Sequence, residues 1–217
     1  MPDNLPSLQE LGIKHHTDKA VYHGFTVLYD GWLSSLRNKP IRMLEIGILL
    51  GGSLRMWHEY FAAADRIYAA DLLFPEERGL SPLELGPQIE LLRLDQSDRQ
   101  QLRAMPKDLN LIIDDGGHTM EQQQVSLAVL FDHLCPGGTY ILEDLHTSTA
   151  AYAETHGCTS QNNTLRLLED LPDFRFFANN EYHMTGAEFG RLCRQVEFVE
   201  IVRFKHDSIT ARIVKRK

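Results

Sequence analysis

The chain has 217 residues, 43% of them hydrophobic and 24% charged, a composition that fits one folded α/β domain and excludes a disordered, collagen-like or coiled-coil protein. Its 30 acidic and 22 basic residues give a formal net charge of −8, so it lacks the positive charge with which proteins bind nucleic acids or anionic membranes. We therefore expect a small-molecule partner, no nucleic acid and no membrane, with a homo-oligomer left open.

No membrane span or secretion signal is expected from the sequence. No apolar run approaches the roughly 18 residues that span a bilayer, and the first 16 residues lack a basic start followed by an apolar stretch. The three cysteines, Cys135, Cys158 and Cys193, form no C-x-x-C pair, which is typical of free thiols in a reducing compartment. These features predict a cytoplasmic protein.

Strands and helices alternate through the first two thirds of the chain. Short apolar runs followed by acidic residues predict strands at 41–46, 66–70, 88–94, 109–113 and 139–143. Apolar residues at helical spacing predict a helix at 53–64, and the pairs Ser97/Gln100 and Thr119/Gln122 predict capping boxes that open two more. This alternation favours a parallel sheet covered by helices on both faces.

The last third is less regular and ends in a hairpin. Helices are predicted at 163–171 and, capped by Thr185 and Glu188, at 187–196, and two apolar runs at 196–204 and 208–214 predict an antiparallel hairpin. We expect one α/β, Rossmann-like domain over residues 1–217 with a mostly parallel seven-stranded sheet. Residues 1–40 would form a helical or lid segment, and 145–195 the substrate loops.

Acidic residues end every predicted parallel strand: Glu45, Asp71, Asp95, Asp114 with Asp115, and Glu143 with Asp144. Ligands of open α/β sheets bind beyond the carboxyl ends of the strands, so these acids should form an acidic rim around the ligand, although any one alone could cap a helix. Such a rim repels pyrophosphate, and Leu49 replaces the second glycine of G-x-G-x-x-G, which disfavours an NAD-dependent oxidoreductase.

A nucleoside ligand that carries positive charge and no phosphate fits this rim better. S-adenosylmethionine, with its sulfonium and ammonium groups, has these properties. Asp71 is placed to accept hydrogen bonds from both ribose hydroxyls, and Glu45 and Gly47 would lie at the amino-acid end.

Three of the acids also predict a metal site. Asp115 and the pair Glu143–Asp144 follow neighbouring strands about 4.8 Å apart, so their carboxylates can converge on Mg²⁺, or on Mn²⁺ or Ca²⁺. The alternative is that Asp114 and Asp115 cap the next helix while Glu143 and Asp144 point into water. His118, in a Gly-Gly turn three residues after Asp115, is placed to take a proton from a hydroxyl near this metal.

Four motifs in order resemble the class I, metal-dependent sugar O-methyltransferases of macrolide and other antibiotic pathways, such as the mycinamicin and macrocin enzymes. They are TDK…HGFT..YD, LEIGILLGGSLRMW, IIDDGGH and LEDLHTS, and the resemblance covers roughly residues 14–148 and the last hairpin. Cephalosporin hydroxylase-like proteins are similar more distantly. The resemblance implies a class I methyltransferase fold and a methyl-transfer activity.

The resemblance also implies roles for individual residues. Asp115, Glu143 and Asp144 would bind Mg²⁺, with His118 as the general base and Asp115 beside it as the second catalytic residue. The residues expected at the cofactor are Thr17, Asp18 and Lys19 folded over it, Glu45 and Gly47 at its methionine end, Asp71 at its ribose, Gln96 with Ser97 or Asp98 near its adenine, and Ser53, Asp95 and Asp114 around them.

The expected function is therefore S-adenosylmethionine- and Mg²⁺-dependent O-methylation of a sugar-bearing or polyhydroxylated natural product. A catechol or hydroxylated β-lactam acceptor, and a cofactor-binding protein without turnover, stay open. Candidate substrate contacts lie in the irregular region: His146, Tyr152, Tyr182 and His183. The segment 22–29 fits a cofactor lid and an amphipathic helix packed on the sheet equally well.

Overall fold

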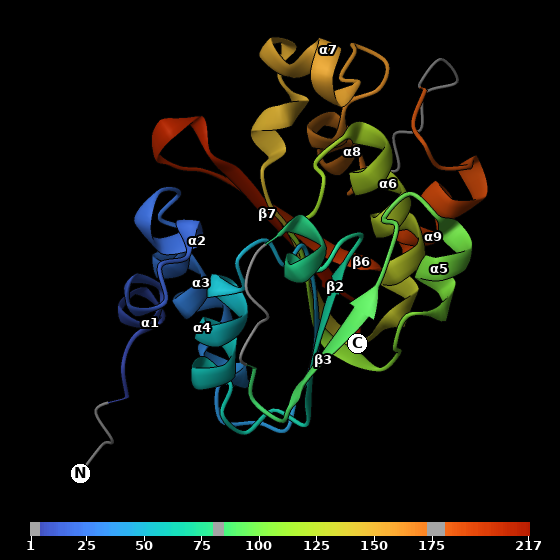
Figure 1. Cartoon of the computed structure of the whole chain (residues 1–217). Coiled ribbons are helices and arrows are strands. Elements are labelled where there is room, and N and C mark those ends of the chain that lie inside the picture. Colours follow the sequence, from blue (N-terminus) through green and yellow to red (C-terminus); the bar gives the residue numbers. More distant parts are fainter. Residues whose placement is uncertain (1–4, 80–84, 173–180) are drawn as a thin grey trace.

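A seven-stranded sheet with strand order β3-β2-β1-β4-β5-β7-β6 forms the centre of the protein (Figure 1). The computed structural model describes residues 5–79, 85–172 and 181–217. Strands β1 to β5 are parallel, and β7 runs antiparallel to both β5 and β6. The strands are β1 Arg42–Ile46, β2 Arg66–Asp71, β3 Ile89–Arg93, β4 Leu109–Asp114, β5 Leu134–Leu142, β6 Val196–Arg203 and β7 Ile209–Lys215.

Helices cover both faces of the sheet, with α1 to α4 on one face and α5, α6 and α9 on the other (Figure 1). The α-helices are α1 Leu8–Lys14, α2 Asp18–Val21, α3 Phe25–Leu33, α4 Gly52–Tyr60, α5 Arg99–Ala104, α6 Met120–Leu130, α7 Ala153–His156, α8 Thr164–Asp170 and α9 Gly186–Gln195. The 3₁₀ segments are η1 Ser34–Leu36, η2 Pro75–Arg78, η3 Phe131–His133, η4 Leu145–Ser148, η5 Ala150–Tyr152 and η6 Lys205–Asp207. None of these helices in the described ranges is long and apolar enough to cross a membrane.

The alternation of side chains along each strand divides the core into two layers. In β1, Met43 packs with α1, α3 and α4, whereas Leu44 packs with the helices of the opposite face. Because this period is two, Glu45 lies on the same face as Met43, toward α4. The same rule applied to β4 sends Asp114 to the face of Ile112, toward α6.

The predicted fold class and the five predicted parallel strands are confirmed. The capping boxes of Thr119 with Gln122 and of Thr185 with Glu188 open α6 and α9 as expected. The predicted cap at Ser97 is wrong, because Asp98 accepts hydrogen bonds from the backbone N–H groups at the start of α5. The Ser97 hydroxyl instead donates to Asp95 over 2.7 Å.

Candidate active site

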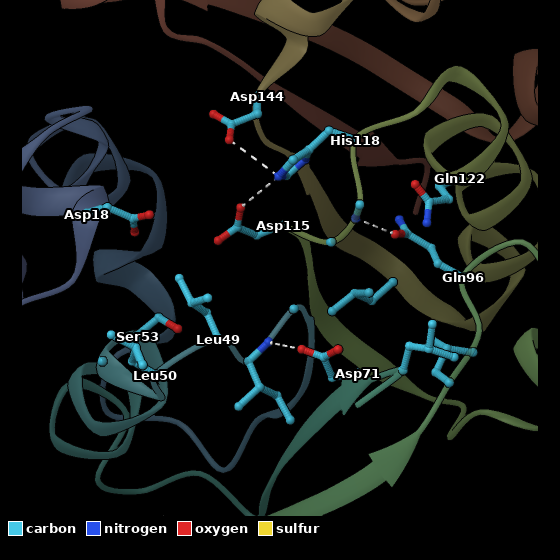
Figure 2. Close-up of a pocket in the computed structure, with 18 of the residues that line it drawn as sticks. Asp18, Leu49, Leu50, Ser53, Asp71, Gln96, Asp115, His118, Gln122 and Asp144 are labelled. Carbon is cyan, nitrogen blue, oxygen red and sulfur yellow. Dashed lines mark hydrogen bonds and ion pairs between the residues drawn. The ribbon is translucent and has the colours of Figure 1, made fainter. Parts of the chain in front are cut away.

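A cavity of about 590 Å³ lies beyond the carboxyl ends of β1, β2, β3 and β4. Its volume is in the range of small-molecule sites, about 300–1,000 Å³. Figure 2 shows Asp18, Leu49, Leu50 and Ser53 on one side of it and His118, Gln96 and Gln122 on the other. Seven of the residues expected at the cofactor line it: Thr17, Asp18, Gly47, Ser53, Asp71, Asp95 and Gln96.

Asp71, at the end of β2, shapes the loop that follows β1. Its carboxylate accepts hydrogen bonds from the backbone N–H of Ile48 over 2.9 Å and from that of Leu73 over 3.2 Å. Figure 2 shows the Asp71 side chain at the cavity. The side chain therefore fixes the cavity wall and also lines the cavity.

Gly47 lets two strand ends approach each other closely. Its φ is +96°, and a Cβ on it would lie 1.9 Å from the carbonyl oxygen of Asp115. Any side chain here would push the loop after β4 away from the loop after β1. This glycine therefore brings Asp115 to the cavity, and Gly47 itself lines the cavity, where a contact with the methionine end of the cofactor stays a prediction.

Lys19 lies among carboxylates beneath the cavity. Its side chain is 1% exposed, and its ammonium group donates a short hydrogen bond to Asp115 and lies 3.1 Å from Glu143 and 3.7 Å from Glu45. These acids end β1, β4 and β5, so the short helix α2 is fixed to three strand ends by one side chain. Lys19 is not among the cavity-lining residues, and its place differs from the expected contact with the cofactor.

A close approach of two helices carries Lys19 into this position. A Cβ on Gly12 of α1 would lie 2.5 Å from the Cβ of Ala20, so α2 packs against α1 where α1 has no side chain. Ala20 and Lys19 are consequently buried, while Val21 stays 61% exposed.

The charges around Lys19 shift one another's pKa. Burial alone would lower the pKa of Lys19, but the negative charges of Asp115, Glu143 and Glu45 outweigh it and raise that pKa well above 10.5. Burial raises the pKa of Glu45 to about 7 against the attraction of Lys19 and the hydrogen bond from Trp57, and it raises the pKa of Glu143 well above 4.5. Burial raises the pKa of Asp115 as well, so the cluster contains one cation held charged and three carboxyl groups that are costly to ionise.

Glu45 is a structural acid in the described structure. It accepts hydrogen bonds from the Ser53 hydroxyl over 3.0 Å and from the Trp57 indole over 3.1 Å, and it has no exposed surface. Trp57, expected to be a core residue, is fully buried and also orients this carboxylate. Glu45 therefore lies below the cavity wall, although the sequence predicted it in the cofactor site.

Replacing Glu45 with glutamine is expected to flatten the pH dependence of stability between about pH 4.5 and 7. Because the pKa of Glu45 is higher in the folded protein than in the unfolded chain, the folded state favours the protonated carboxyl group. The free energy of unfolding therefore falls as the pH rises through this window, by at most about 1.4 kcal/mol per pH unit. Urea unfolding at several pH values across this window measures the slope. Glu59→Gln is the control, because the hydrogen bond from Lys14 lowers the pKa of Glu59, so Glu59 is ionised throughout this window and its replacement should leave the slope unchanged. A slope in Glu45→Gln as steep as in the wild type would contradict the expectation.

Asp114 faces the opposite side of the sheet and is also buried. Its carboxylate accepts from Gln96 over 2.5 Å, Ser126 over 2.5 Å and Tyr140 over 2.6 Å. The carbonyl oxygen of the Gln96 side chain accepts in turn from the backbone of Gly117 over 3.0 Å, so this network holds the loop that carries His118 (Figure 2). Five residues that the sequence predicted at the cofactor do not line this cavity: Lys19, Glu45, Ser97, Asp98 and Asp114.

Asp115, His118 and Asp144 come together on the cavity wall. His118 Nε2 lies 3.4 Å from Asp144 Oδ2 and 3.8 Å from Asp115 Oδ1, and each of the three offers a ligand atom within 4.8 Å of the others (Figure 2). His118 and Asp144 both have positive φ, 59° and 54°, which is uncommon for residues other than glycine and concentrates at functional sites. The backbone of the His118 turn is held by the Thr147 hydroxyl, which donates to the carbonyl oxygen of His118 over 3.0 Å.

Asp115 and Asp144 supply part of the ligand set that a hard divalent cation requires. Two carboxylates supply oxygen donors, and Asp144 Oδ1 is buried with no hydrogen-bond partner among the described residues. Glu143, predicted as the third ligand, lies against Lys19 and would have to share its carboxylate with that ammonium group. The acidic rim expected from the sequence is thus split: Asp71, Asp95, Asp115 and Asp144 line the cavity, while Glu45, Asp114 and Glu143 are buried below it.

The four candidate substrate residues divide into two pairs. His146 and Tyr152 line a second cavity of about 400 Å³. The Tyr182 hydroxyl lies 3.5 Å from Asp170, and His183 contacts Asn162 over 2.9 Å. Neither residue lines either of these two cavities. Sequence reasoning missed the other aromatic residues of the second cavity, because they come from segments far apart in the chain.

The strand order, the antiparallel last hairpin and the cavity beyond β1 define the class I methyltransferase fold. An S-adenosylmethionine-dependent O-methyltransferase from Thermotoga maritima shares this fold with a TM-score of 0.57 at 13% identity. The methyltransferase MycE of the mycinamycin biosynthetic pathway, solved with Mg, S-adenosylhomocysteine and mycinamycin VI, superposes with a TM-score of 0.77 at 28% identity, over 99% of this chain and 56% of that one. No family model matches the sequence.

Within this class the chain is a homologue of the sugar O-methyltransferases of antibiotic pathways, as the four motifs predicted. It is 36% identical over 181 residues to an 8-demethyl-8-(2-methoxy-α-L-rhamnosyl)-tetracenomycin-C 3′-O-methyltransferase of Streptomyces olivaceus, covering 76% of this chain and 45% of the relative. It is 32% identical over 183 residues to the mycinamicin VI 2″-O-methyltransferase of Micromonospora griseorubida, covering 77% of this chain and 44% of the relative. The chain thus spans less than half the length of these curated relatives.

Proposed function

We propose that this protein is an S-adenosylmethionine- and Mg²⁺-dependent O-methyltransferase that acts on a hydroxyl of a sugar-bearing natural product. The observation that carries the proposal is the group Asp115, His118 and Asp144, which lies on the wall of the same cavity as Asp71. A site for hydroxyl activation and a site for a nucleoside therefore share one space. The curated and solved relatives support the choice of cofactor, metal and acceptor class.

The chain's residues would divide the chemistry between them. Asp71 would bind the ribose of S-adenosylmethionine, and Asp115 and Asp144 would hold Mg²⁺, which lowers the pKa of an acceptor hydroxyl when bound. His118 Nε2, facing the space between these two carboxylates, would accept the hydroxyl proton. The acceptor oxygen would then take the methyl group from sulfur, leaving S-adenosylhomocysteine.

His118 fits a proton acceptor better than a third metal ligand. Mg²⁺ prefers oxygen donors, and imidazole suits transition metals. The Lys19 cluster would keep Asp115 oriented from below while its other oxygen faces His118. The three free cysteines support placing this reaction in the cytoplasm.

Calorimetric titration of S-adenosylmethionine and S-adenosylhomocysteine, with and without Mg²⁺, tests the proposal. We expect both to bind, and we expect methyl transfer to mycinamicin VI or to 8-demethyl-8-α-L-rhamnosyl tetracenomycin C to require Mg²⁺. Asp71→Ala should weaken S-adenosylhomocysteine binding about 10- to 100-fold, because hydrogen bonds to a charged group contribute about 1.5–3 kcal/mol. Failure of the wild-type protein to bind either nucleoside would refute the proposal. Methyl transfer to catechol and to neither glycoside would favour the alternative acceptor class, and binding without any transfer would indicate a cofactor-binding protein.

A further inference from the structure

The turn that carries His118 is enclosed by two glutamine side chains. A Cβ on Gly116 would lie 2.2 Å from Oε1 of Gln96. A Cβ on Gly117 would lie equally close, 2.2 Å, to Oε1 of Gln122. Figure 2 shows both glutamines beside the turn, one from the loop after β3 and the other from α6. The two glycines leave room for these amides, so the position of the turn depends on where the amides are held.

The Gln96 amide has one orientation that satisfies both of its neighbours. Its oxygen accepts from the backbone N–H of Gly117 over 3.0 Å, and its nitrogen donates to the Asp114 carboxylate over 2.5 Å. An amide turned the other way would set two donors against each other at Gly117 and two acceptors against each other at Asp114. The Asp114 carboxylate therefore decides how Gln96 meets the turn.

The Asp114 carboxylate is fixed in turn by hydroxyl groups from β5 and α6. Its second oxygen accepts from Tyr140 over 2.6 Å and from Ser126 over 2.5 Å. Ser126 has a single hydroxyl proton and also lies 2.7 Å from the carbonyl oxygen of Gln122, so Asp114 shares that donor. The Tyr140 hydroxyl, whose nearest acceptor is Asp114, therefore fixes the carboxylate most directly. Tyr140 and Asp114 are 0% and 1% exposed, and neither lines the cavity.

His118 depends on these contacts because its backbone is strained. Its φ of 59° lies in the left-handed region, which is unfavourable for residues with a Cβ and persists where the surrounding structure fixes it. The turn is anchored before His118 by the N–H of Gly117 and after it by the Thr147 hydroxyl, which donates to the His118 carbonyl oxygen over 3.0 Å. Loss of one anchor lets the turn relax, and a displacement of about 1 Å in an active site can lower a rate about 100-fold.

We propose that Tyr140 is a positioning residue for methyl transfer and acts on His118 from within the core. The Tyr140 hydroxyl fixes the Asp114 carboxylate, and that carboxylate fixes Gln96. Gln96 then holds the turn in which the imidazole of His118 faces the cavity. The inference rests on the proposed function, in which His118 accepts the hydroxyl proton, and adds the buried groups that orient it.

Methyl transfer by Tyr140→Phe tests the assignment, because this change removes one hydroxyl group and leaves the ring in the core. The acceptor is mycinamicin VI or 8-demethyl-8-α-L-rhamnosyl tetracenomycin C. We expect kcat to fall about 10- to 100-fold, the usual cost of losing a group that orients an active-site side chain, with KM and S-adenosylhomocysteine affinity within about twofold of wild type.

Tyr60→Phe is the matched control. Tyr60 is also buried, and its hydroxyl also donates to an aspartate, Asp30, over 2.6 Å. This pair joins α4 to α3 on the other face of the sheet and does not involve the turn. Its kcat should therefore stay near that of the wild type.

A double variant shows whether Tyr140 acts through His118. In His118→Ala there is no imidazole left to orient, so adding Tyr140→Phe should lower kcat no further. Hydrogen exchange of the Gly117 backbone N–H, measured without cofactor, metal or acceptor, is a readout that needs no turnover. This exchange should be about tenfold faster in Tyr140→Phe than in the wild type and unchanged in Tyr60→Phe.

Equal kcat values for Tyr140→Phe and Tyr60→Phe would overturn the inference, as would an undiminished loss when Tyr140→Phe is added to His118→Ala. A wild-type protein that transfers no methyl group would instead refute the proposed function. Exchange at Gly117 as slow in Tyr140→Phe as in the wild type would overturn the chain of hydrogen bonds whether or not transfer occurs.

Discussion

Replacing Lys19 with methionine is expected to lower the free energy of unfolding at pH 7 by about 3–5 kcal/mol, the cost of leaving one side of a buried ion cluster uncompensated. The Lys19 ammonium group lies within 3.7 Å of Glu45 and closer to Glu143 and Asp115, and its side chain is 1% exposed. Methionine fills a similar volume, so the loss reports the missing charge rather than a cavity. Urea unfolding of both proteins under the same conditions measures the difference.

The loss should grow as the pH rises. The pKa values of Glu45 and Glu143 are raised in the folded protein, so at low pH both carboxyl groups carry protons and need no cation. Lys19 lowers the pKa of Glu45, so in the variant folded Glu45 keeps its proton above pH 7, whereas in the unfolded chain it ionises near its ordinary pKa of 4.5. Stability of Lys19→Met should therefore fall more steeply with pH than that of the wild type.

Lys14→Met is the matched control for this experiment. Lys14 also pairs with a glutamate, Glu59, over 2.6 Å, but its side chain is 58% exposed. Exposed pairs contribute about 0–1 kcal/mol, so this variant should unfold close to the wild type. Similar losses in the two variants, or a loss in Lys19→Met that does not depend on pH, would contradict the role given to the buried cluster.

Lys19 also shows where the sequence stops predicting the site. The acids that end β1, β4 and β5 were visible because each follows an apolar run, and the register of a parallel sheet brings such ends together. Which side each acid faces depends on the alternation of side chains along its strand, and this alternation places Glu45 and Glu143 below the cavity and Asp144 on its wall. The pairing of Lys19 with Asp115 and Glu143 joins residues 96 and 124 positions apart, and a four-residue helix has no periodicity that would reveal it.

Local signals were more dependable than those that depend on long-range packing. The capping boxes of Thr119 and Thr185 are confirmed because a cap is made within four residues. The prediction at Ser97 failed because an equally local competitor, Asp98, lay next to it. The second cavity could not be predicted, since Tyr22 and His206 meet only after the β6–β7 hairpin has folded back beside α2.

Replacing His118 with alanine is expected to reduce kcat by about 10²- to 10⁴-fold, the usual contribution of general acid–base catalysis. S-adenosylhomocysteine affinity should change little, because Asp71 and the loop after β1 stay in place. Asp115→Asn should lower kcat as well and weaken the dependence of the rate on Mg²⁺, because it removes a carboxylate charge from the metal-binding group. Single-turnover methyl transfer at saturating cofactor, measured over a range of Mg²⁺ concentrations, separates these two effects.

Chemical rescue distinguishes a proton acceptor from a residue that only shapes the loop. Imidazole added to the assay should restore part of the activity of His118→Ala, because the cavity beside Asp115 and Asp144 is open and the small base can enter the vacated space. It should restore none in Asp115→Asn, where the histidine is intact. His58→Ala serves as the control, because His58 lies on α4 outside the cavity lining and its loss should leave kcat near that of the wild type. If His118→Ala loses cofactor affinity and activity in parallel and imidazole restores neither, His118 holds the cavity together and another group accepts the proton.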